Sequence, residues 1–227
     1  MQNIENNLAR IKQQIEQAAT DFDRKTSNIS LLAVSKRKPA SDLRSAYNCG
    51  QRDFGENFLQ EAQQKMRELA DLDIVWHFIG PVQSNKTKAL AESFDWVHCV
   101  DRVKIAQRLS NQRPESMPPL NICIQVNIDL EASKSGVAPN DITALAESIR
   151  HLPKIKLRGL MAIPAQHSDF ESQREPFARL KQALHDLQQH GLDCDTLSMG
   201  MSHDMQAAIA EGSTLVRIGT AIFGERL

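Results

Sequence analysis

A lysine near the start of the chain stands where it could act as a nucleophile. Lys36 follows the short apolar run LLAV and one serine, and Arg37 and Lys38 come directly after it. A lysine amine attacks an aldehyde only in its neutral form, and partial burial beside other cations favours that form. The pattern is therefore compatible with a Schiff base on Lys36. It also fits a solvated turn at the end of a strand, with Pro39 starting the next helix.

A second group of candidates lies in residues 197–209, LSMGMSHDMQAAI. Gly200 allows backbone to approach a ligand closely, and Ser202 and Asp204 are favourable N-cap residues for a helix that starts at about His203. The unpaired N–H groups at such a helix start suit a phosphate dianion. A helix that is simply capped by serine gives the same pattern, so this segment alone leaves both interpretations open.

The segment 216–224, VRIGTAIFG, repeats the combination of glycine and a hydroxyl group. Here Gly219 and Thr220 follow an apolar run. Barrels of alternating strands and helices often bind phosphate after their seventh and eighth strands. Two such turns after the last two apolar runs therefore favour a phosphate site over coincidence. Arg217 lies within the apolar run itself, and a buried arginine needs a specific partner.

Other apolar runs also end in residues that could contact a ligand. His77 alternates with apolar neighbours and so could face the interior of a barrel, although a hydrogen-bonded core histidine explains it equally well. Lys134 is most simply a solvent-exposed loop lysine, and Met199 a core residue. The candidates of this group are Asn57, His77, Asn127, Lys134 and Met199.

Eight short apolar runs, rich in β-branched residues, predict the strands that position these side chains. A helical pattern follows each of the first seven runs. Parallel strands joined by helices are covered on both faces, which explains why the runs are apolar almost throughout. Eight such units in 227 residues favour an α/β fold with a single (β/α)8 TIM barrel over an open sheet. The strands are predicted at 30–35, 53–56, 74–80, 96–100, 121–128, 157–163, 196–200 and 214–219, and the helices at 42–49, 58–70, 84–93, 104–111, 142–150, 170–190 and 203–211.

An amphipathic helix is predicted to precede the barrel, at residues 1–20. Ile4, Leu8, Ile11 and Ile15 recur there at the three-to-four spacing that lines one helical face. This N-terminal stretch lacks the apolar core of a signal peptide. No linker rich in proline, glycine and serine divides the chain, so we expect residues 1–227 to form one domain.

Composition argues against several classes of function. With 27 Lys and Arg against 28 Asp and Glu, the formal net charge is −1, which disfavours nucleic-acid binding. No apolar run of about 18 residues is present to span a membrane. The four cysteines are far apart and give no metal-ligand spacing, so we expect no metal site and reduced thiols in a cytoplasmic protein. Neither a P-loop nor a hydrolase motif occurs.

Together, the segments resemble the pyridoxal 5′-phosphate (PLP) homeostasis family, which is related to the N-terminal domain of alanine racemase and to the fold-type III PLP enzymes. The resemblance covers nearly the whole chain from about Ile29, and the set of motifs is far more specific than any single one. Phe58 departs from it, because tyrosine often stands there in the family. The motifs are AVSK at 33–36, FGEN at 54–57, WHFIGPVQSNK at 76–86, QVN at 125–127, SKSG at 133–136, GLMAIP at 159–164, LSMGMSHDM at 197–205 and VRIGTAIFG at 216–224.

The resemblance implies that Lys36 holds PLP as a Schiff base and that Arg217 faces the pyridine nitrogen. A guanidinium only donates hydrogen bonds, so it would keep that nitrogen an unprotonated acceptor and weaken the ring as an electron sink. Such a site favours cofactor holding, or restrained racemase chemistry, over decarboxylation and transamination. The implied cofactor residues are Lys36, Asn57, His77, Met199, Ser202, Arg217, Gly219 and Thr220, with Ser202, Gly219 and Thr220 on the phosphate.

The first functional hypothesis is a monomeric carrier that serves PLP homeostasis and passes PLP to PLP-dependent apo-enzymes. Lys38 and Lys134 are candidates to accept the cofactor on its way out. Under this hypothesis no residue is assigned a catalytic role, and Lys36 is the only candidate for one.

The alternative is a PLP-dependent amino-acid racemase, which needs a second base on the other face of the substrate Cα. In alanine racemase this base is a tyrosine from a C-terminal β-domain, for which the present chain is too short. Tyr47, the one tyrosine, is predicted on the outer ring, which leaves His77 as the fallback. A third hypothesis is a barrel that binds another phosphorylated metabolite at Ser202 and Thr220, with Lys36 uninvolved.

Overall fold

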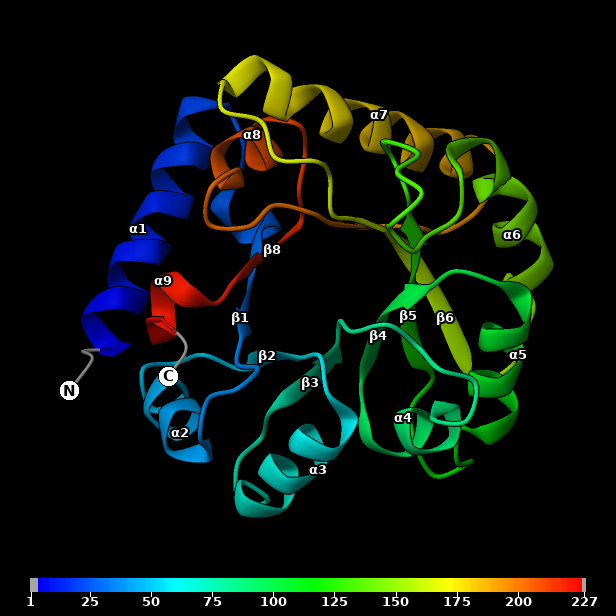
Figure 1. Cartoon of the computed structure of the whole chain (residues 1–227), viewed down its shortest axis with the longest axis horizontal. Coiled ribbons are helices and arrows are strands. Elements are labelled where there is room, and N and C mark those ends of the chain that lie inside the picture. The colour runs from blue at the N-terminus through cyan, green and yellow to red at the C-terminus, as the bar shows by residue number, and fades with distance from the viewer. Residues whose placement is uncertain (1–3, 226–227) are drawn as a thin grey trace.

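Eight parallel strands close into a barrel in which they follow one another in chain order (Figure 1). The computed structural model describes residues 4–225. β1 pairs with β8 to close the ring. The TIM barrel predicted from the sequence is confirmed, and every strand boundary lies within two residues of its prediction. The strands are β1 (Ser30–Val34), β2 (Asp53–Glu56), β3 (Val75–Phe78), β4 (Trp96–Val100), β5 (Leu120–Val126), β6 (Ile155–Ala162), β7 (Thr196–Ser198) and β8 (Leu215–Ile218).

Helices connect the strands and form the outer ring in Figure 1. All seven predicted connecting helices are present. The structure adds α9 and the short 3-10 helices Thr26–Asn28 and Pro139–Asp141, which are too short to show a helical period. The helices after α1 are α2 (Ala40–Asn48), α3 (Leu59–Glu68), α4 (Thr87–Ser93), α5 (Val103–Gln112), α6 (Ile142–Ile149), α7 (Phe170–Gln189), α8 (Met205–Ala210) and α9 (Thr220–Phe223).

The N-terminal helix α1 (Ile4–Asp21) packs against α8, α9 and α2. Its predicted apolar face, with Ile4, Leu8, Ile11 and Ile15, is buried. The helix was predicted from residue 1, and residues 1–3 lie outside the described part, as do 226–227. Because α9 has only four residues, α1 supplies much of the cover outside the junction of β8 and β1.

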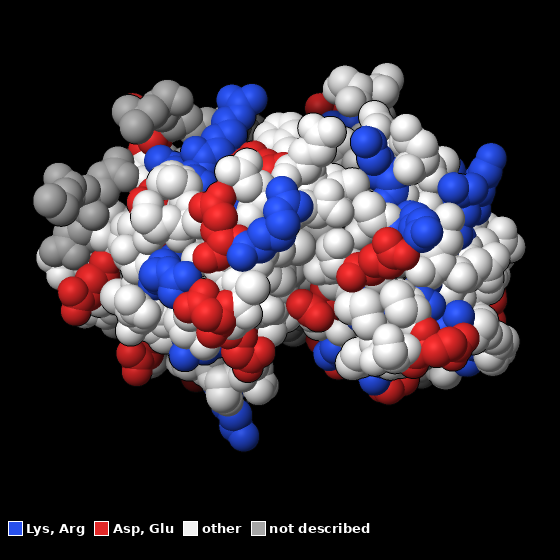
Figure 2. All heavy atoms as spheres, turned by 90° about the horizontal axis from the view of Figure 1, so that it is seen from below, with Lys and Arg blue, Asp and Glu red and all other residues white. Residues whose placement is uncertain are grey.

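Charged side chains of both signs are interspersed over the face shown in Figure 2. The chain has a net charge of −1, and on this face the two signs are mixed and not separated into opposed patches. Between residues 4 and 225, no helix is long and apolar enough to cross a membrane. The same residues contain no cluster of three or more His, Cys, Asp and Glu side chains that could hold a metal ion.

Candidate functional site

The carboxyl ends of β8, β1 and β2 bring three of the predicted site residues to one edge of the barrel. Asn57 directly follows β2 and Gly219 directly follows β8, whereas one residue separates Lys36 from the end of β1. The three strands are neighbours in the ring. A Cβ on Gly219 would lie 3.1 Å from the carbonyl oxygen of Val34. The glycine therefore lets the turn after β8 approach the end of β1 without crowding that carbonyl group.

Lys36 is half-buried in a turn after β1, and the residues on both sides of it are held by carboxylates. The Ser35 hydroxyl donates to Oε1 of Glu56 (2.6 Å). The N–H of Arg37 donates to Oε1 of Glu61 (2.5 Å). Arg37 has φ +61°, a left-handed conformation that is costly for a residue with a side chain. The two bonds therefore hold a turn that the backbone alone would not favour.

A buried lysine lies beneath this turn. Lys65 donates to the carbonyl of Ser35 (2.8 Å), to Glu56 (2.7 Å) and to Glu61 (2.6 Å). Burial raises the pKa of Glu56 above its ordinary value, against the opposing effect of the Lys65 ammonium and the Ser35 hydroxyl. We call Glu56, Glu61 and Lys65 the charged cluster. It fixes the backbone on both sides of Lys36.

Asn57 has a buried side-chain oxygen that lacks a hydrogen-bond partner within the described structure. The loop after β3 packs tightly on its backbone, since a Cβ on Gly80 would lie 2.2 Å from the carbonyl oxygen of Asn57. Buried polar atoms are nearly always paired in native proteins. The Oδ1 atom of Asn57 is therefore positioned to accept a hydrogen bond from a ligand.

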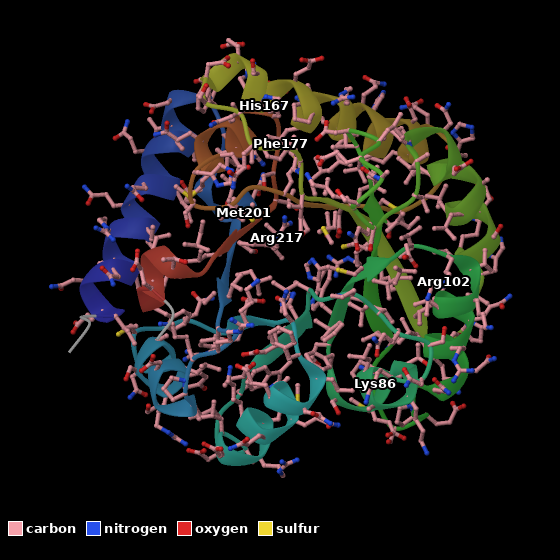
Figure 3. All side chains as sticks on the ribbon, in the orientation of Figure 1. Lys86, Arg102, His167, Phe177, Met201 and Arg217 are labelled. Atoms are coloured by element: carbon pink, nitrogen blue, oxygen red, sulfur yellow. The ribbon has the colours of Figure 1, made fainter. Side chains whose placement is uncertain are left out.

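Arg217 is buried in the barrel interior and binds neutral groups. Its Nη1 donates to both the carbonyl and the hydroxyl of Ser198, the latter at 2.9 Å, and its Nη2 donates to the carbonyl of Ala162 (2.9 Å). These bonds use three of the five guanidinium N–H groups. Burial lowers the pKa of Arg217 from its ordinary value. Figure 3 shows the side chain projecting from β8 toward the centre of the ring.

The turn after β7 differs from its prediction in where the helix begins. α8 starts at Met205 and has Asp204 as its N-cap residue, whereas we expected a start at about His203. The Asp204 carboxylate accepts from the N–H of Met201 (2.5 Å), which keeps residues 201–204 in a turn. Ser202 is exposed two residues before the N-cap, so the expectation that it caps the helix is wrong. Its contact with phosphate stays a prediction.

The turns after the neighbouring strands β7 and β8 each contain a glycine and a residue with a hydroxyl group. Gly219 is the N-cap residue of α9, and Thr220 is exposed at the start of that helix. Gly200 has φ +96°, and a Cβ there would lie 2.6 Å from the Cβ of Ala208, so this turn requires glycine. Met199 is fully buried next to Gly200. Contact of these residues with a cofactor is a proposal, taken up below.

His77 lies apart from the other predicted cofactor residues. Its Nε2 is 3.0 Å from Oδ1 of Asp53, the first residue of β2, and its ring stacks on Trp96, the first residue of β4. It helps to line a cavity of about 410 Å³, here called the N-terminal cavity, at the amino ends of the strands. The side chain points into the barrel as expected but toward its amino end, because it is hydrogen-bonded there. The other residues of this cavity are Arg24, Ser27, Asn28, Ser30, Asp53, Trp96, Arg158, Asp195, Thr196, Thr214 and Leu215.

The two lysines considered for cofactor transfer both bind backbone carbonyls. Lys38 donates to the carbonyl of Glu225 (2.7 Å), which ties the turn after β1 to the C-terminal segment. Lys134 donates to the carbonyl of Ile163 (3.1 Å) and forms an ion pair with Glu131 (2.5 Å). Lys134 is thus a positioned loop residue and not the freely solvated lysine that its context suggested.

Tyr47 and Asn127 form hydrogen bonds with backbone groups of nearby loops. Tyr47 lies in α2 on the outer ring, as predicted, where its hydroxyl accepts from the N–H of Asp73 (3.3 Å). Asn127 donates to the carbonyls of Glu131 (2.8 Å) and Lys134 (3.2 Å) and so folds its own loop.

Sequence reasoning missed three residues of the site: Lys65, Ser198 and His98. Lys65 shares the buried face of α3 with Ala62, a position where the helical period expects an apolar residue. His98 alternates with the outward-facing Val97 in β4, as His77 alternates with Trp76 in β3. That repeated placement of histidine on adjacent strands was the available signal. Ser198 gave none, because a serine in a three-residue strand is unremarkable.

Comparisons with known proteins agree with this architecture. The family model of the alanine racemase N-terminal domain matches residues 1–227. A pyridoxal phosphate homeostasis protein of Pseudomonas aeruginosa is 58% identical over 226 residues, which cover 100% of this chain and 97% of the relative. The structure of PipY from Synechococcus elongatus PCC7942 with PLP bound superposes with a TM-score of 0.86 at 37% identity, covering 98% of this chain and 100% of PipY.

A more distant structure shows the fold alone. Alanine racemase of Clostridium difficile has 14% identity and a TM-score of 0.78, with 99% of this chain and 57% of the racemase covered. The barrel of the racemase is thus shared without a close sequence relationship. The full-length match to the domain model and the identity to the curated relative place this chain in the alanine racemase N-terminal domain family, among the pyridoxal phosphate homeostasis proteins.

Proposed function

We propose that this chain binds PLP at the carboxyl ends of its strands and holds it as a Schiff base on Lys36. PLP brings an aldehyde that reacts with a lysine amine and a ring that withdraws electrons from bonds near it. The PLP-bound structure of PipY and the names of the close relatives support the choice of ligand. The residues proposed to hold it are Lys36, Asn57, Met199, Ser202, Arg217, Gly219 and Thr220.

The residues present fit such a ligand in two respects. Asn57 offers a buried acceptor that no described residue satisfies, and a ligand hydroxyl group can donate to it. Arg217 keeps two N–H groups beyond the three used by Ser198 and Ala162, and these suit an acceptor atom such as a ring nitrogen. A hydrogen-bond donor in β8 and an acceptor directly after β2 are thus suited to a ligand.

The single observation that carries the proposal is the placement of Lys36, in the turn after β1, and of Arg217, in the strand β8 that pairs with β1. Since a guanidinium only donates, Arg217 holds a ring nitrogen as an unprotonated acceptor. It thereby restrains the electron withdrawal on which carbanion chemistry depends. The charged cluster holds the turn of Lys36 in place.

The absorption spectrum of the protein after incubation with PLP and dialysis tests this proposal. The parent should keep a yellow absorption band that Lys36→Ala lacks. Lys38→Ala is the matched control, because it removes a lysine two residues away on the same turn and should keep the band. A colourless parent, or a band that persists in Lys36→Ala, would contradict the proposal.

We further propose that the protein serves PLP homeostasis by passing PLP to PLP-dependent apo-enzymes in the cytoplasm, and that it acts as a monomer. The names of the relatives support the role in PLP homeostasis. Lys38 and Lys134 are the proposed acceptors on the way out; release rates unchanged in their alanine variants would exclude them. Light scattering of the purified protein tests the monomer.

Amino-acid racemisation is the alternative for the same site. It requires a second base, and the two candidates lie elsewhere: Tyr47 is on the outer ring and His77 faces the N-terminal cavity. Exchange of the α-hydrogen of alanine in deuterated buffer distinguishes the two functions. Exchange that depends on Lys36 would favour the racemase, whereas the carrier predicts none.

A further inference from the structure

Five side chains form a continuous chain of hydrogen bonds across the interior of the barrel. Arg217 of β8 donates to the hydroxyl of Ser198 on β7 (2.9 Å), and that hydroxyl lies 2.8 Å from Nδ1 of His98 on β4. Nε2 of His98 lies 2.9 Å from Nδ1 of His77 on β3. Nε2 of His77 lies 3.0 Å from Asp53 at the start of β2. The chain connects Arg217 to the N-terminal cavity.

With both rings neutral, the Asp53 end of this chain determines the direction of every bond in it. An ionised Asp53 can only accept, so His77 carries its proton on Nε2 and donates to Asp53. Nδ1 of His77 is then an acceptor, so His98 carries its proton on Nε2 and donates to His77. Nδ1 of His98 in turn accepts from the Ser198 hydroxyl, which itself accepts a hydrogen bond from Arg217.

Burial agrees with neutral rings. Ser198 and His98 are fully buried and His77 is 1% exposed. Burial, and after it the nearby His77 and Arg217, hold the pKa of His98 well below its ordinary value. If both rings were charged, an N–H group of each would face the other between Nε2 of His98 and Nδ1 of His77, and that bond would be lost.

Arg217 lacks a directly bound counter-charge in the part of the chain that the structure describes. Within residues 4–225 no carboxylate lies at ion-pair distance from its guanidinium, although the charge of the buried Asp204 raises the pKa of Arg217 against the larger effect of burial. Asp53, whose side chain is 35% exposed, is bound to His77. The neighbouring Asp195 of the same cavity is instead paired with Arg158 (2.7 Å). The hydrogen-bond chain thus joins a buried cation to a carboxylate at the other end of the barrel.

We propose that Ser198, His98, His77 and Asp53 form a relay that positions the Arg217 guanidinium and connects it to a carboxylate at the other end of the barrel. All four are positioning residues, since they act on the ligand only through Arg217. The relay makes the hold on a ligand at the carboxyl end sensitive to a change at the N-terminal cavity. That consequence for PLP rests on the proposed function, whereas the bonding pattern of the relay does not.

Histidine tautomers in the ligand-free protein test the bonding pattern directly. Long-range ¹H–¹⁵N spectra should show His77 and His98 neutral and protonated on Nε2, with assignments from His77→Gln and His98→Gln. Asp53→Asn should shift the nitrogen signals of His98, two links away. The matched control Asp195→Asn removes a carboxylate from the same cavity and should leave them unchanged. A proton on Nδ1 of His98, a charged ring, or equal effects of the two variants would overturn the relay.

PLP retention tests its effect at the other end. Ser198→Ala removes the bridging hydroxyl but leaves both backbone carbonyls that bind Arg217, and it should weaken PLP binding about tenfold, as expected for one hydrogen bond to a charged group. Ser213→Ala is the control, because it removes another buried hydroxyl, bonded to the carbonyl of Met199 (2.7 Å), and should change binding less than about twofold. Equal retention by parent and Ser198→Ala would overturn the positioning role.

The two measurements separate the possible failures. If the parent binds no PLP, the proposed function fails while the tautomers still decide whether the relay exists. If the parent binds PLP and the tautomers or the Ser198→Ala result disagree with expectation, the relay fails and the proposed function stands.

Discussion

Lys36, in the turn after β1, and Arg217, in the neighbouring strand β8, are supported in different ways. The turn of Lys36 is held by ion pairs among Glu56, Glu61 and Lys65, which bind the backbone on both sides of it. Arg217 is held by carbonyl groups and a neutral hydroxyl, which bind its side chain directly.

The difference separates two tasks. Buried charges that neutralise one another locally can fix a turn. Losing one of them leaves its partner unpaired and costs much stability. Among the described residues, the groups bound directly to the Arg217 guanidinium are neutral, so its charge remains effective toward a ligand. We therefore expect changes in the charged cluster to act mainly on stability, and changes around Arg217 to act mainly on PLP binding.

The largest expected effect comes from the charged cluster. Lys65→Met leaves the fully buried Glu56 carboxylate without its cation, which should lower the free energy of unfolding by about 3–5 kcal/mol. Urea unfolding measures this change. The double variant Lys65→Met with Glu56→Gln removes both charges and should recover much of the loss. A loss below about 1 kcal/mol in the single variant would show that the cluster behaves like a surface ion pair.

The next effect concerns Arg217, where we expect a larger change in PLP binding than in stability. Arg217→Gln should weaken PLP binding by about 1.5–3 kcal/mol, roughly ten- to a hundredfold, because it removes a charged hydrogen-bond donor. Equilibrium titration with PLP gives the change, and urea unfolding of the ligand-free variant should show a smaller loss than Lys65→Met. A variant that loses stability like Lys65→Met but binds PLP like the parent would contradict the division of tasks.

The third prediction concerns His98, which makes the free energy of unfolding depend on pH. The pKa of His98 is depressed in the folded protein, so the folded state takes up this proton at lower pH than the unfolded state. The contribution of the neutral His98 to the free energy of unfolding is present above about pH 6.5. It is lost as the pH falls, at up to about 1.4 kcal/mol per pH unit.

Urea unfolding between about pH 7 and pH 5 checks this dependence. His98→Gln should remove that part of the slope. His185→Gln, at an exposed position of α7, should leave the slope unchanged. If the slopes of the parent and His98→Gln agree, His98 is not held neutral.

The smallest effect is expected at Asn57, which adjoins the charged cluster but carries no charge. Asn57→Ala removes a buried acceptor that has no partner in the ligand-free protein, so unfolding should change by less than about 0.5 kcal/mol. PLP binding should weaken by about 0.5–1.5 kcal/mol, as for one neutral hydrogen bond. Strong destabilisation without loss of PLP binding would assign Asn57 a structural role instead.

The sequence was sufficient for the fold and for the turns that carry Lys36, Asn57 and Gly219, because apolar runs and their polar ends are local features. It was insufficient where two nearby residues could play the same part, or where the partner comes from another element. Both Ser202 and Asp204 are favourable N-cap residues, and the structure has Asp204 at the N-cap of α8, with its carboxylate on the N–H of Met201. The residue types alone do not decide between the two.

The direction of His77 within the barrel shows the same limit. Alternation along β3 indicates that the side chain faces inward, but not toward which end of the barrel it is bonded. The answer depends on Asp53 and His98, which stand 24 and 21 residues away in sequence. Lys65 was missed for a related reason, since its three acceptors come from β2, α3 and the turn after β1.

The central claim is that Lys36 carries PLP, and the most direct measurement locates the attached group. The PLP-loaded protein is reduced with borohydride, digested with trypsin and analysed by mass spectrometry. Cleavage after a modified Lys36 is blocked, so the account predicts the phosphopyridoxyl mass on a peptide that spans residues 26–37. The same mass on a peptide containing Lys38 or Lys134 but not Lys36, or no modified peptide, would contradict it.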